Sequence, residues 1–312
     1  MIKKIVSAFV SCTLISTLAV TSFAEVDPMF RFGYKDNGMI YDRYKETEEF
    51  GFAYNDTGIT ITNYTEKYAR PTIPNEINGK PVKKIGDYAF ARSGYDIVSV
   101  SIPDSVETID RAAFWQCKLL EEINIPDGVT YLGVSAFRDC ASLTSLKLPS
   151  GITSIENWTF DNCSSLKSIE IPNGVTSVGY ESFYNCSSLA SVKIPDTVVS
   201  IEGNAFRNCK SLTEIEIPYS VGNMGSWSLW GCSSLKLIIL PDEIDTTYVG
   251  IPETAAQIKY RKTANGVEIT EMICGIGGND AEIPKEICGI PVISFGEDIS
   301  SRAGICEESE EI

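Results

Sequence analysis

Apolar residues recur along the middle of the chain at a fixed interval. Ile-Pro or Leu-Pro pairs place proline at positions 103, 126, 149, 172, 195, 218 and 241, a constant step of 23 residues. Cysteine keeps this step from Cys117 to Cys232, and a core aromatic position keeps it from Phe114 to Phe206, with Leu229 in the next copy. A fixed period of about 20–29 residues with apolar anchors predicts a solenoid in which each repeat is one turn of a coil.

The first half of each repeat has the pattern of a strand. In one repeat, Ile169 and Ile171 alternate with polar residues, which predicts a short strand with one buried face. Pro172 lacks an amide donor and ends that strand. Val175 and Val178 then return to the core.

The second half of each repeat is predicted to turn back toward the next strand. Ser182-Phe183 fits a short helical or 3₁₀ turn that directs the phenyl ring inward. The residue before the cysteine suits a left-handed backbone turn, since it is asparagine or aspartate at positions 139, 162, 185 and 208. A single repeat buries too little apolar surface to fold alone, so we expect a continuous stack with covered ends.

Both ends of the array have candidate covers. Residues 50–64 have the pattern of a hairpin with its turn near residues 55–58, and residues 73–90 that of an irregular first repeat. At the other end the outward strand positions become Leu237 and Ile239, so we expect residues 248–260 to fold back over them.

The C-terminal part repeats the opening sequence. IPKEICGIPV (283–292) matches IPNEINGKPV (73–82). The similar segments GVEIT and GITIT precede these two sequences, respectively. This part resembles the start of a second array that is either degenerate or truncated.

We therefore divide the chain into a signal peptide (1–24), an irregular segment (25–49), a cap hairpin with the first irregular repeat (50–93), regular 23-residue repeats (94–246), a C-terminal cap (247–262) and a degenerate or truncated second repeat module with an acidic tail (263–312).

The N-terminus has the layout of a secretory signal peptide. Lys3 and Lys4 precede an apolar run, and Ser22 and Ala24 are small residues that predict cleavage after Ala24. The alternative, a lipoprotein cysteine at Cys12, lacks the usual preceding leucine. Removal of the two lysines changes the formal net charge from −16 to −18, which disfavours nucleic acid and anionic membrane surfaces as partners. No later segment has the length of a membrane span.

The repeat C-x-S-L-x-x-I-x-I-P-x-x-V-x-x-I-x-x-x-A-F-x-x, seen at residues 140–162 and 186–208, resembles the BspA-like class of leucine-rich repeats. The resemblance covers residues 50–262. It implies a leucine-rich repeat solenoid, a right-handed β/α superhelix with a parallel β-sheet on the concave face and short helical or 3₁₀ turns on the other. It also implies an exported bacterial surface protein that adheres to proteins, cells or carbohydrate-rich surfaces.

The cysteines in register allow two interpretations. Neighbouring repeats would place their α-carbons about 4.8 Å apart, which permits disulfides in an oxidising compartment. We favour free, buried thiols that act as small hydrophobic groups, because equivalent side chains in a stack point the same way and Gly94 takes this position in the first regular repeat. A disulfide is more readily expected among the cysteines outside the register, Cys274, Cys288 and Cys306.

Catalytic chemistry has little support in the sequence. Histidine is absent, which excludes Ser-His and Cys-His pairs and histidine metal ligands. The 23-residue cysteine spacing is not zinc-ligand spacing. A glycosidase-type carboxylate pair stays open among 42 acidic residues, although none of them stands out. We predict no catalytic residue, no metal site and no cofactor.

Two surfaces are candidate binding sites. The first is the outward column of the concave sheet, whose charged members are Lys147, Glu170, Lys193 and Glu216. Alternating lysine and glutamate there have two interpretations, simple pairing across the sheet or contact with a protein or glycan partner.

The second candidate is an aromatic ridge. Trp115, Tyr184 and Trp230 follow the core aromatic position, where other repeats have Arg138, Asp161 and Arg207, and this mixed polarity predicts exposed rings suited to stacking on sugars. Trp158 and Trp227 are expected to pack between repeats. The sequence thus predicts a secreted or cell-surface binding or adhesion protein with an extracellular protein or glycan partner. The alternative is an architectural spacer, or a remnant of a larger surface protein, without a ligand of its own.

Overall fold

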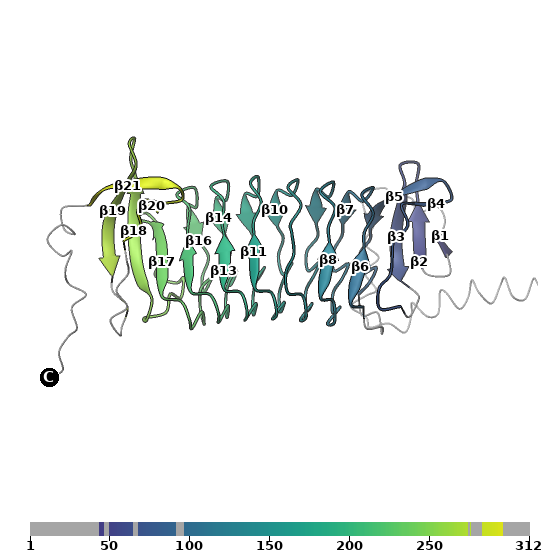
Figure 1. Cartoon of the computed structure of the whole chain (residues 1–312), viewed down its shortest axis with the longest axis horizontal. Coiled ribbons are helices and arrows are strands. Elements are labelled where there is room, and N and C mark those ends of the chain that lie inside the picture. Colours follow the sequence, from purple (N-terminus) through teal and green to yellow (C-terminus); the bar gives the residue numbers. More distant parts are fainter. Residues whose placement is uncertain are drawn as a thin grey trace, which may run out of the picture. The chain divides into compact units, whose positions relative to one another are not determined.

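The computed structural model describes residues 44–46, 50–64, 68–91, 97–273, 275 and 283–295, all within one unit that spans residues 42–312. Those residues form a β-solenoid in which short strands from successive turns stack side by side (Figure 1). The predicted signal peptide, the acidic tail and four residues named above, Cys12, Gly94, Cys274 and Cys306, lie outside the described residues.

Two ladders of parallel strands run along the array, where the sequence pattern had predicted one. The first ladder contains the predicted strands β6 (Ser99–Ser101), β8 (Glu122–Asn124), β11 (Ser168–Glu170), β13 (Ser191–Lys193), β15 (Glu214–Glu216) and β17 (Leu237–Pro241). The strand that the repeat pattern predicts at residues 145–147 does not form, and strand pairing within this ladder joins β6 with β8, β11 with β13 and β15 with β17. The second ladder contains the shorter strands β7 (Thr108–Ile109), β9 (Tyr131–Leu132), β10 (Ser154–Ile155), β12 (Ser177–Val178), β14 (Ser200–Ile201) and β16 (Asn223–Met224).

Strand pairing joins residues 23 positions apart. In the first ladder Ile169 of β11 is in register with Val192 of β13, which confirms that the predicted strand continues into the next turn as a parallel neighbour. In the second ladder Ser154 is in register with Ser177. Each strand of the second ladder is only two residues long, too short for a period of two to be recognised in the sequence.

The third side of each turn is a row of β-turns, which we call the turn side. No helix or 3₁₀ turn occurs among the residues described, so the predicted helical turns are wrong. The amide of Ala136 donates to the carbonyl of Gly133 in its own turn, whereas the amide of Phe137 donates to the carbonyl of Thr159 in the next turn. Ser135 has a φ of 59°. A helix needs consecutive right-handed residues and bonds from each amide to the fourth carbonyl before it, and both conditions fail here. The predicted left-handed conformation before the cysteine is confirmed at Asp139, Asn162, Asn185 and Asn208.

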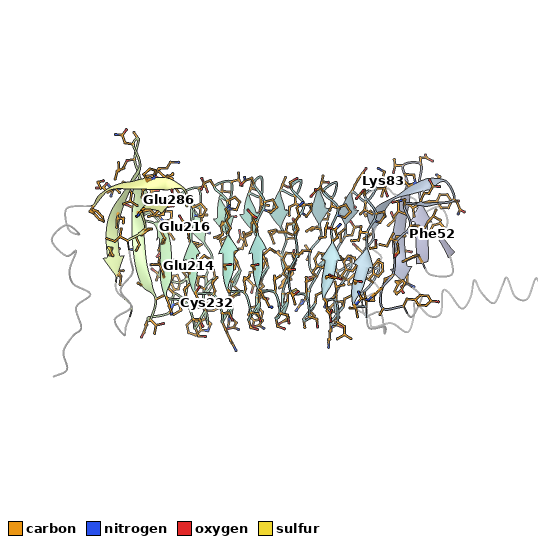
Figure 2. The ribbon with its side chains drawn as sticks, viewed as in Figure 1. Phe52, Lys83, Glu214, Glu216, Cys232 and Glu286 are labelled. Atoms are coloured by element: carbon orange, nitrogen blue, oxygen red, sulfur yellow. The ribbon has the colours of Figure 1, made fainter. Side chains whose placement is uncertain are left out.

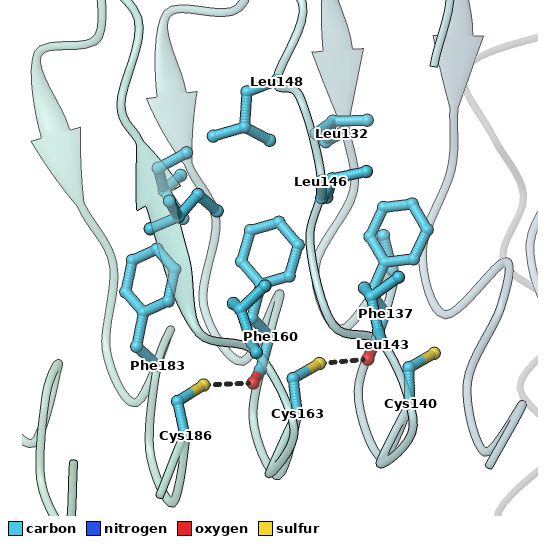
Figure 3. Close-up of a cluster of buried hydrophobic side chains, with 14 of the residues drawn as sticks. Leu132, Phe137, Cys140, Leu143, Leu146, Leu148, Phe160, Cys163, Phe183 and Cys186 are labelled. Atoms are coloured by element: carbon cyan, nitrogen blue, oxygen red, sulfur yellow. Dashed lines mark hydrogen bonds between the residues drawn. The ribbon is translucent and has the colours of Figure 1, made fainter. Parts of the chain in front are cut away.

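The core is a set of side-chain columns along the array. The core aromatic column contains Phe90, Phe114, Phe137, Phe160, Phe183 and Phe206. Consecutive rings in this column stack with centroids 5.0 to 5.7 Å apart. Columns of leucine, isoleucine, valine and cysteine surround these rings (Figure 3). Because each side chain is covered by its equivalents in the turns before and after, burial depends on a continuous stack, as predicted.

The N-terminal module comprises residues 50–85. Its strands are β2 (Phe50–Tyr54), β3 (Ile59–Tyr64), β4 (Glu76–Ile77) and β5 (Lys80–Ile85), and β1 (Tyr44–Glu46) flanks β2. Strands β2 and β3 form the predicted hairpin, with the Asn55 side chain accepting the amides of Thr57 and Gly58 in the turn. Strand β5 pairs in parallel with β3 on one side and with β7 of the array on the other.

The C-terminal module comprises residues 256–295. Its strands are β18 (Ala256–Lys262), β19 (Val267–Ile273), β20 (Glu286–Ile287) and β21 (Ile290–Phe295). Strand β18 continues the first ladder by pairing in parallel with β17. The hairpin of β20 and β21 lies near β17 and β18 (Figure 1). This module therefore both extends the sheet and overhangs it.

Candidate functional site

Three members of the predicted charged column, Glu170, Lys193 and Glu216, lie on strands of the first ladder, whereas Lys147 lies in a turn of the array that forms no strand at this position. Lys147 pairs with Asp127 at 3.0 Å and not with Glu170. Glu170 and Lys193 pair across β11 and β13 at 3.4 Å, with both side chains about three-quarters exposed. The predicted alternation of paired charges therefore holds for one of these lysines. Exposed pairs of this kind contribute only about 0.2–1 kcal/mol, so the column is available to a partner.

A groove with a volume of about 1080 Å³ lies where the column meets the C-terminal module. Its floor is formed by β13, β15 and β17 and its end by the segment that contains β20. Figure 2 shows Glu286 of this hairpin near Glu214 and Glu216 of β15. Apolar residues also line the groove, namely Val192, Ile194, Leu237, Ile239 and Ile283.

The hairpin is held over the sheet by a polar contact and an apolar cluster. The carboxylate of Glu216 accepts the backbone amide of Cys288, and the hydroxyl of Tyr260 donates to the carbonyl of Ile217 at 2.9 Å. Ile287 is fully buried in the cluster that contains Ile239 and Tyr260. The expectation that residues 248–260 fold back over Leu237 and Ile239 is therefore wrong, because β18 lies beside β17 as the next strand of the sheet. Ile287 of the hairpin packs in the cluster with Ile239 instead, and the sequence did not indicate this role of residues 286–292. The available signal in the sequence was the apolar pattern of residues 286–292, taken together with the apolar residues Leu237 and Ile239 at outward strand positions.

Cys288 lines the groove as a neutral thiol. Burial raises the pKa of Cys288 to about 12, and the neighbouring Glu216 carboxylate adds to the rise. Because the thiolate is the nucleophilic form, this cysteine has no reactive character near neutral pH.

The predicted aromatic ridge is not one uniform exposed surface. Trp115 is half-buried, and its indole N–H donates to Asp139 at 3.0 Å. Tyr184 is also half-buried, with the Arg207 guanidinium 5.8 Å from its ring centroid. Trp230 is 54% exposed, as predicted.

The two tryptophans expected to pack between repeats differ. Trp158 does so, with its ring 5.8 Å from that of Tyr180 and its N–H bonded to Glu181. Trp227 is 51% exposed, so this expectation is wrong for it. The turn that follows Trp227 has a different sequence around Tyr248, and the indole contacts Arg207 of the turn before it.

One acid of the turn side is buried, contrary to its predicted exposure. Asp161 is 1% exposed and pairs with Arg138 at 2.9 Å. Burial raises the pKa of Asp161 to about 6, against the opposing effect of Arg138. Beside it, a ladder of side-chain bonds runs from Asn208 through Asn185 and Asn162 to Asp139. These polar groups bond mainly to one another and stabilise the stack.

The cysteines in register are free, buried thiols, as favoured from the sequence. Each thiol donates to a phenylalanine carbonyl of a neighbouring turn at 3.2 to 3.3 Å, for example Cys163 to Phe137 and Cys186 to Phe160 (Figure 3). Burial raises the pKa of the Cys163 and Cys186 thiols well above the usual value. These groups are thus structural.

Metal-binding clusters and membrane-spanning helices are both absent from the part of the chain that the structure describes. No group of three or more cysteine, aspartate or glutamate side chains there has the arrangement of a metal site. None of the described segments forms a helix with the length and hydrophobicity to cross a bilayer.

Comparison with solved structures identifies bacterial leucine-rich repeat proteins. A leucine rich cell surface protein from Faecalibacterium prausnitzii is 32% identical with a TM-score of 0.60, and the alignment covers 73% of this chain and 60% of that one. A leucine-rich repeat protein from T. pallidum is 31% identical with a TM-score of 0.57, and the alignment covers 62% of this chain and 91% of that one. A leucine-rich repeat protein from Eubacterium ventriosum is 26% identical with a TM-score of 0.56, and coverage is 66% and 54%. This chain thus spans little more than half the length of the first and third of these proteins.

Comparison with curated proteins finds no match. A family model described as BspA type leucine rich repeat region matches residues 83–196 and 176–259, in six copies. These segments contain both ladders and the row of β-turns. The chain therefore belongs to the BspA type leucine-rich repeat family.

Proposed function

We propose that the chain is a secreted or cell-surface-associated binding protein without enzymatic activity, whose main site is the groove between the first ladder and the C-terminal hairpin. The observation that carries this proposal is the groove itself, which combines an apolar floor with a charged rim. Val192 and Leu237 supply apolar surface, and Lys193, Glu214 and Lys285 supply charges of both signs. An apolar centre with a polar rim is the usual anatomy of a protein interface. The occupant we propose is an extended segment of an extracellular protein, and one of the similar solved structures is described as a leucine rich cell surface protein.

The test is a binding screen with variants that alter the groove. The chain without its predicted signal peptide is applied to an array of extracellular matrix and cell-surface proteins. Ser191 and Lys193 are exposed and line the groove, so Ser191→Trp fills it and Lys193→Glu reverses its charge with little effect on folding. We expect saturable binding that the double variant weakens at least tenfold.

Lys210→Glu is the matched control, since Lys210 is also exposed and lies on the turn side, outside this groove. Absence of any saturable partner, or binding that is insensitive to the groove variant, contradicts the proposal.

The alternative function is an architectural spacer without a ligand. Its support is the C-terminal module, which repeats a module that begins an array at the N-terminal end. If the array is only a spacer, a variant that lacks one whole 23-residue turn is expected to fold and to retain any adhesion that the full chain shows. Loss of adhesion by a folded deletion variant contradicts it.

A further inference from the structure

Arg207 lies between two aromatic rings on the turn side. Its guanidinium carbon is 5.8 Å from the ring centroid of Tyr184 and 5.8 Å from that of Trp227. One guanidinium nitrogen donates to the Asn204 side chain at 3.2 Å. Since a guanidinium has five N–H donors, donors remain for a ligand beside the rings.

Two further rings extend this group in the following turns. Trp230 is 54% and Tyr248 is 67% exposed. The backbone beneath them is fixed, because Leu229 is fully buried and its amide donates to the carbonyl of Val249 at 3.0 Å. We define the aromatic strip as Tyr184, Arg207, Trp227, Trp230 and Tyr248.

Packing does not account for the exposed rings. At the position equivalent to Trp227, four other turns have Ala112, Ser135, Glu181 and Asn204 and one has Trp158, which packs between repeats, and the position equivalent to Trp230 is Arg138 in one of these turns. The same fold is thus built with small or charged side chains at these sites. Exposed tryptophans on a rigid backbone that does not need them indicate a binding surface.

We infer that the aromatic strip binds a neutral glycan chain. The C–H face of a sugar ring packs on the electron-rich face of an aromatic ring, and sugar hydroxyls accept hydrogen bonds from Arg207. Successive turns are about 4.8 Å apart, so the three steps from Tyr184 to Tyr248 span about 14 Å. This length suits a chain better than a single sugar. The net charge of −16 disfavours a polyanionic chain.

A protein partner fits the strip less well than a glycan. Protein hot spots are anchored in desolvated pockets, whereas in the strip the cation Arg207 separates the rings of Tyr184 and Trp227. The strip lies on the turn side and the proposed protein groove on the first ladder. This inference is therefore independent of the proposed function.

The test titrates the chain without its predicted signal peptide with neutral oligosaccharides of β-glucan, xylan and mannan, and with heparin as a polyanion, by calorimetry and tryptophan fluorescence. We expect at least one neutral series to saturate, with an affinity that rises with oligosaccharide length. The double variant Trp227→Ala/Trp230→Ala is expected to weaken binding at least tenfold. Tyr68→Ala is the control, since Tyr68 is 61% exposed and far along the sequence from the strip. Binding of heparin only, no binding by any neutral series, or binding unaffected by the double variant overturns the inference.

A second pair of variants separates this site from the groove and from a folding defect. Trp227→Phe/Trp230→Phe preserves ring faces, so it is expected to retain most of the affinity, and a loss equal to that of the alanine pair contradicts stacking. Ser191→Trp/Lys193→Glu is expected to leave glycan binding unchanged. Glycan binding that fails in the groove variant but survives in the alanine pair assigns the glycan to the groove and overturns the inference.

Discussion

The two ends of the solenoid carry the same module in different surroundings. In the N-terminal module β2 pairs antiparallel with β3, and β3 pairs in parallel with β5. In the C-terminal module β18, β19 and β21 pair in the same way. The irregularities of pairing also coincide. One register shift lies just before Phe52 in the N-terminal module and just before Tyr260 in the C-terminal module, and a second lies just after Ile59 and just after Val267.

The difference lies in what each module packs against. Ile85 of β5 is in register with Ile109 of the array and is fully buried. Phe295 is at the equivalent position of β21 and is 43% exposed. Among the residues described, turns of the array precede only the C-terminal module, and the hairpin of this module overhangs β15 and β17 and forms the groove. The same backbone thus begins an array at one end and creates a candidate binding site at the other.

The largest expected effect is the contrast between these equivalent strand positions. Ile85→Ala is expected to lower the free energy of unfolding by about 2–5 kcal/mol, since it removes fully buried methyl groups from a stacked column. Phe295→Ala is expected to lower it by about 1 kcal/mol or less, because this side chain is already 43% exposed in the folded chain. Urea denaturation followed by circular dichroism measures both. Equal losses would show that β21 is covered as β5 is.

The pH dependence of stability distinguishes the array from both modules. Asp161 is the one charged side chain among the buried residues described, and it lies in the array. Its pKa is about 6 in the folded chain and about 3.9 when unfolded. Between these values the folded state holds a proton that the unfolded chain has released, so stability falls as pH rises through this window and stays reduced above it. Asp161→Asn is expected to raise the free energy of unfolding at pH 7 by on the order of 1–3 kcal/mol.

The check is the same comparison at low pH. Below about pH 4 the wild-type carboxyl is protonated in both states, so the gain from Asp161→Asn is expected to disappear. Asp139→Asn is the companion variant, at the half-buried end of the asparagine ladder. A gain that persists unchanged at pH 3.5 would contradict a role for Asp161 ionisation.

Anchoring of the overhanging hairpin is a smaller effect, specific to the C-terminal module. Glu216→Ala removes the carboxylate that accepts the Cys288 amide, and we expect a loss of about 1 kcal/mol. Hydrogen exchange measured by mass spectrometry is expected to quicken in residues 283–292 and to stay unchanged in residues 73–82. Glu214→Ala is the matched control on the same strand. Equal acceleration by both variants would show that Glu216 does not hold the hairpin.

Much of the array was predictable because each turn repeats the same physical problem. The strand at Ile169, the buried phenylalanine column, the left-handed residues before the cysteines and the free thiols all follow from periodicity and residue type. The helical turns were predicted wrongly. The backbone hydrogen bonds there alternate between the same turn and the next turn, and this alternation is a property of the whole stack. Residue type does not indicate the left-handed conformation either, because it occurs at residues as different as Ser135, Trp158 and Glu181.

The groove was predictable only in part. Lys193 and Glu216 followed from their outward strand positions, and both line it. Its end wall did not follow, because the match between residues 283–292 and 73–82 shows a shared fold without showing which neighbour that fold packs against. Asp161 shows the same limit, since its burial depends on Arg138 of an adjacent turn.

The smallest expected effect concerns the hairpin tip, where the two modules differ by one residue type. Asn78-Gly79 has φ values of 53° and 73°, and Cys288-Gly289 has 51° and 72°, which is the type I′ turn that favours Asn-Gly. Cys288→Asn is therefore expected to stabilise the chain by about 0.5–1 kcal/mol, and Asn78→Cys to destabilise it by a similar amount, because asparagine tolerates the left-handed conformation better than cysteine does. Thermal unfolding of both variants measures the pair. If both substitutions destabilise, the backbones are equivalent but Cys288 is selected by its contacts in the groove, and the tip belongs to the site as well as to the module.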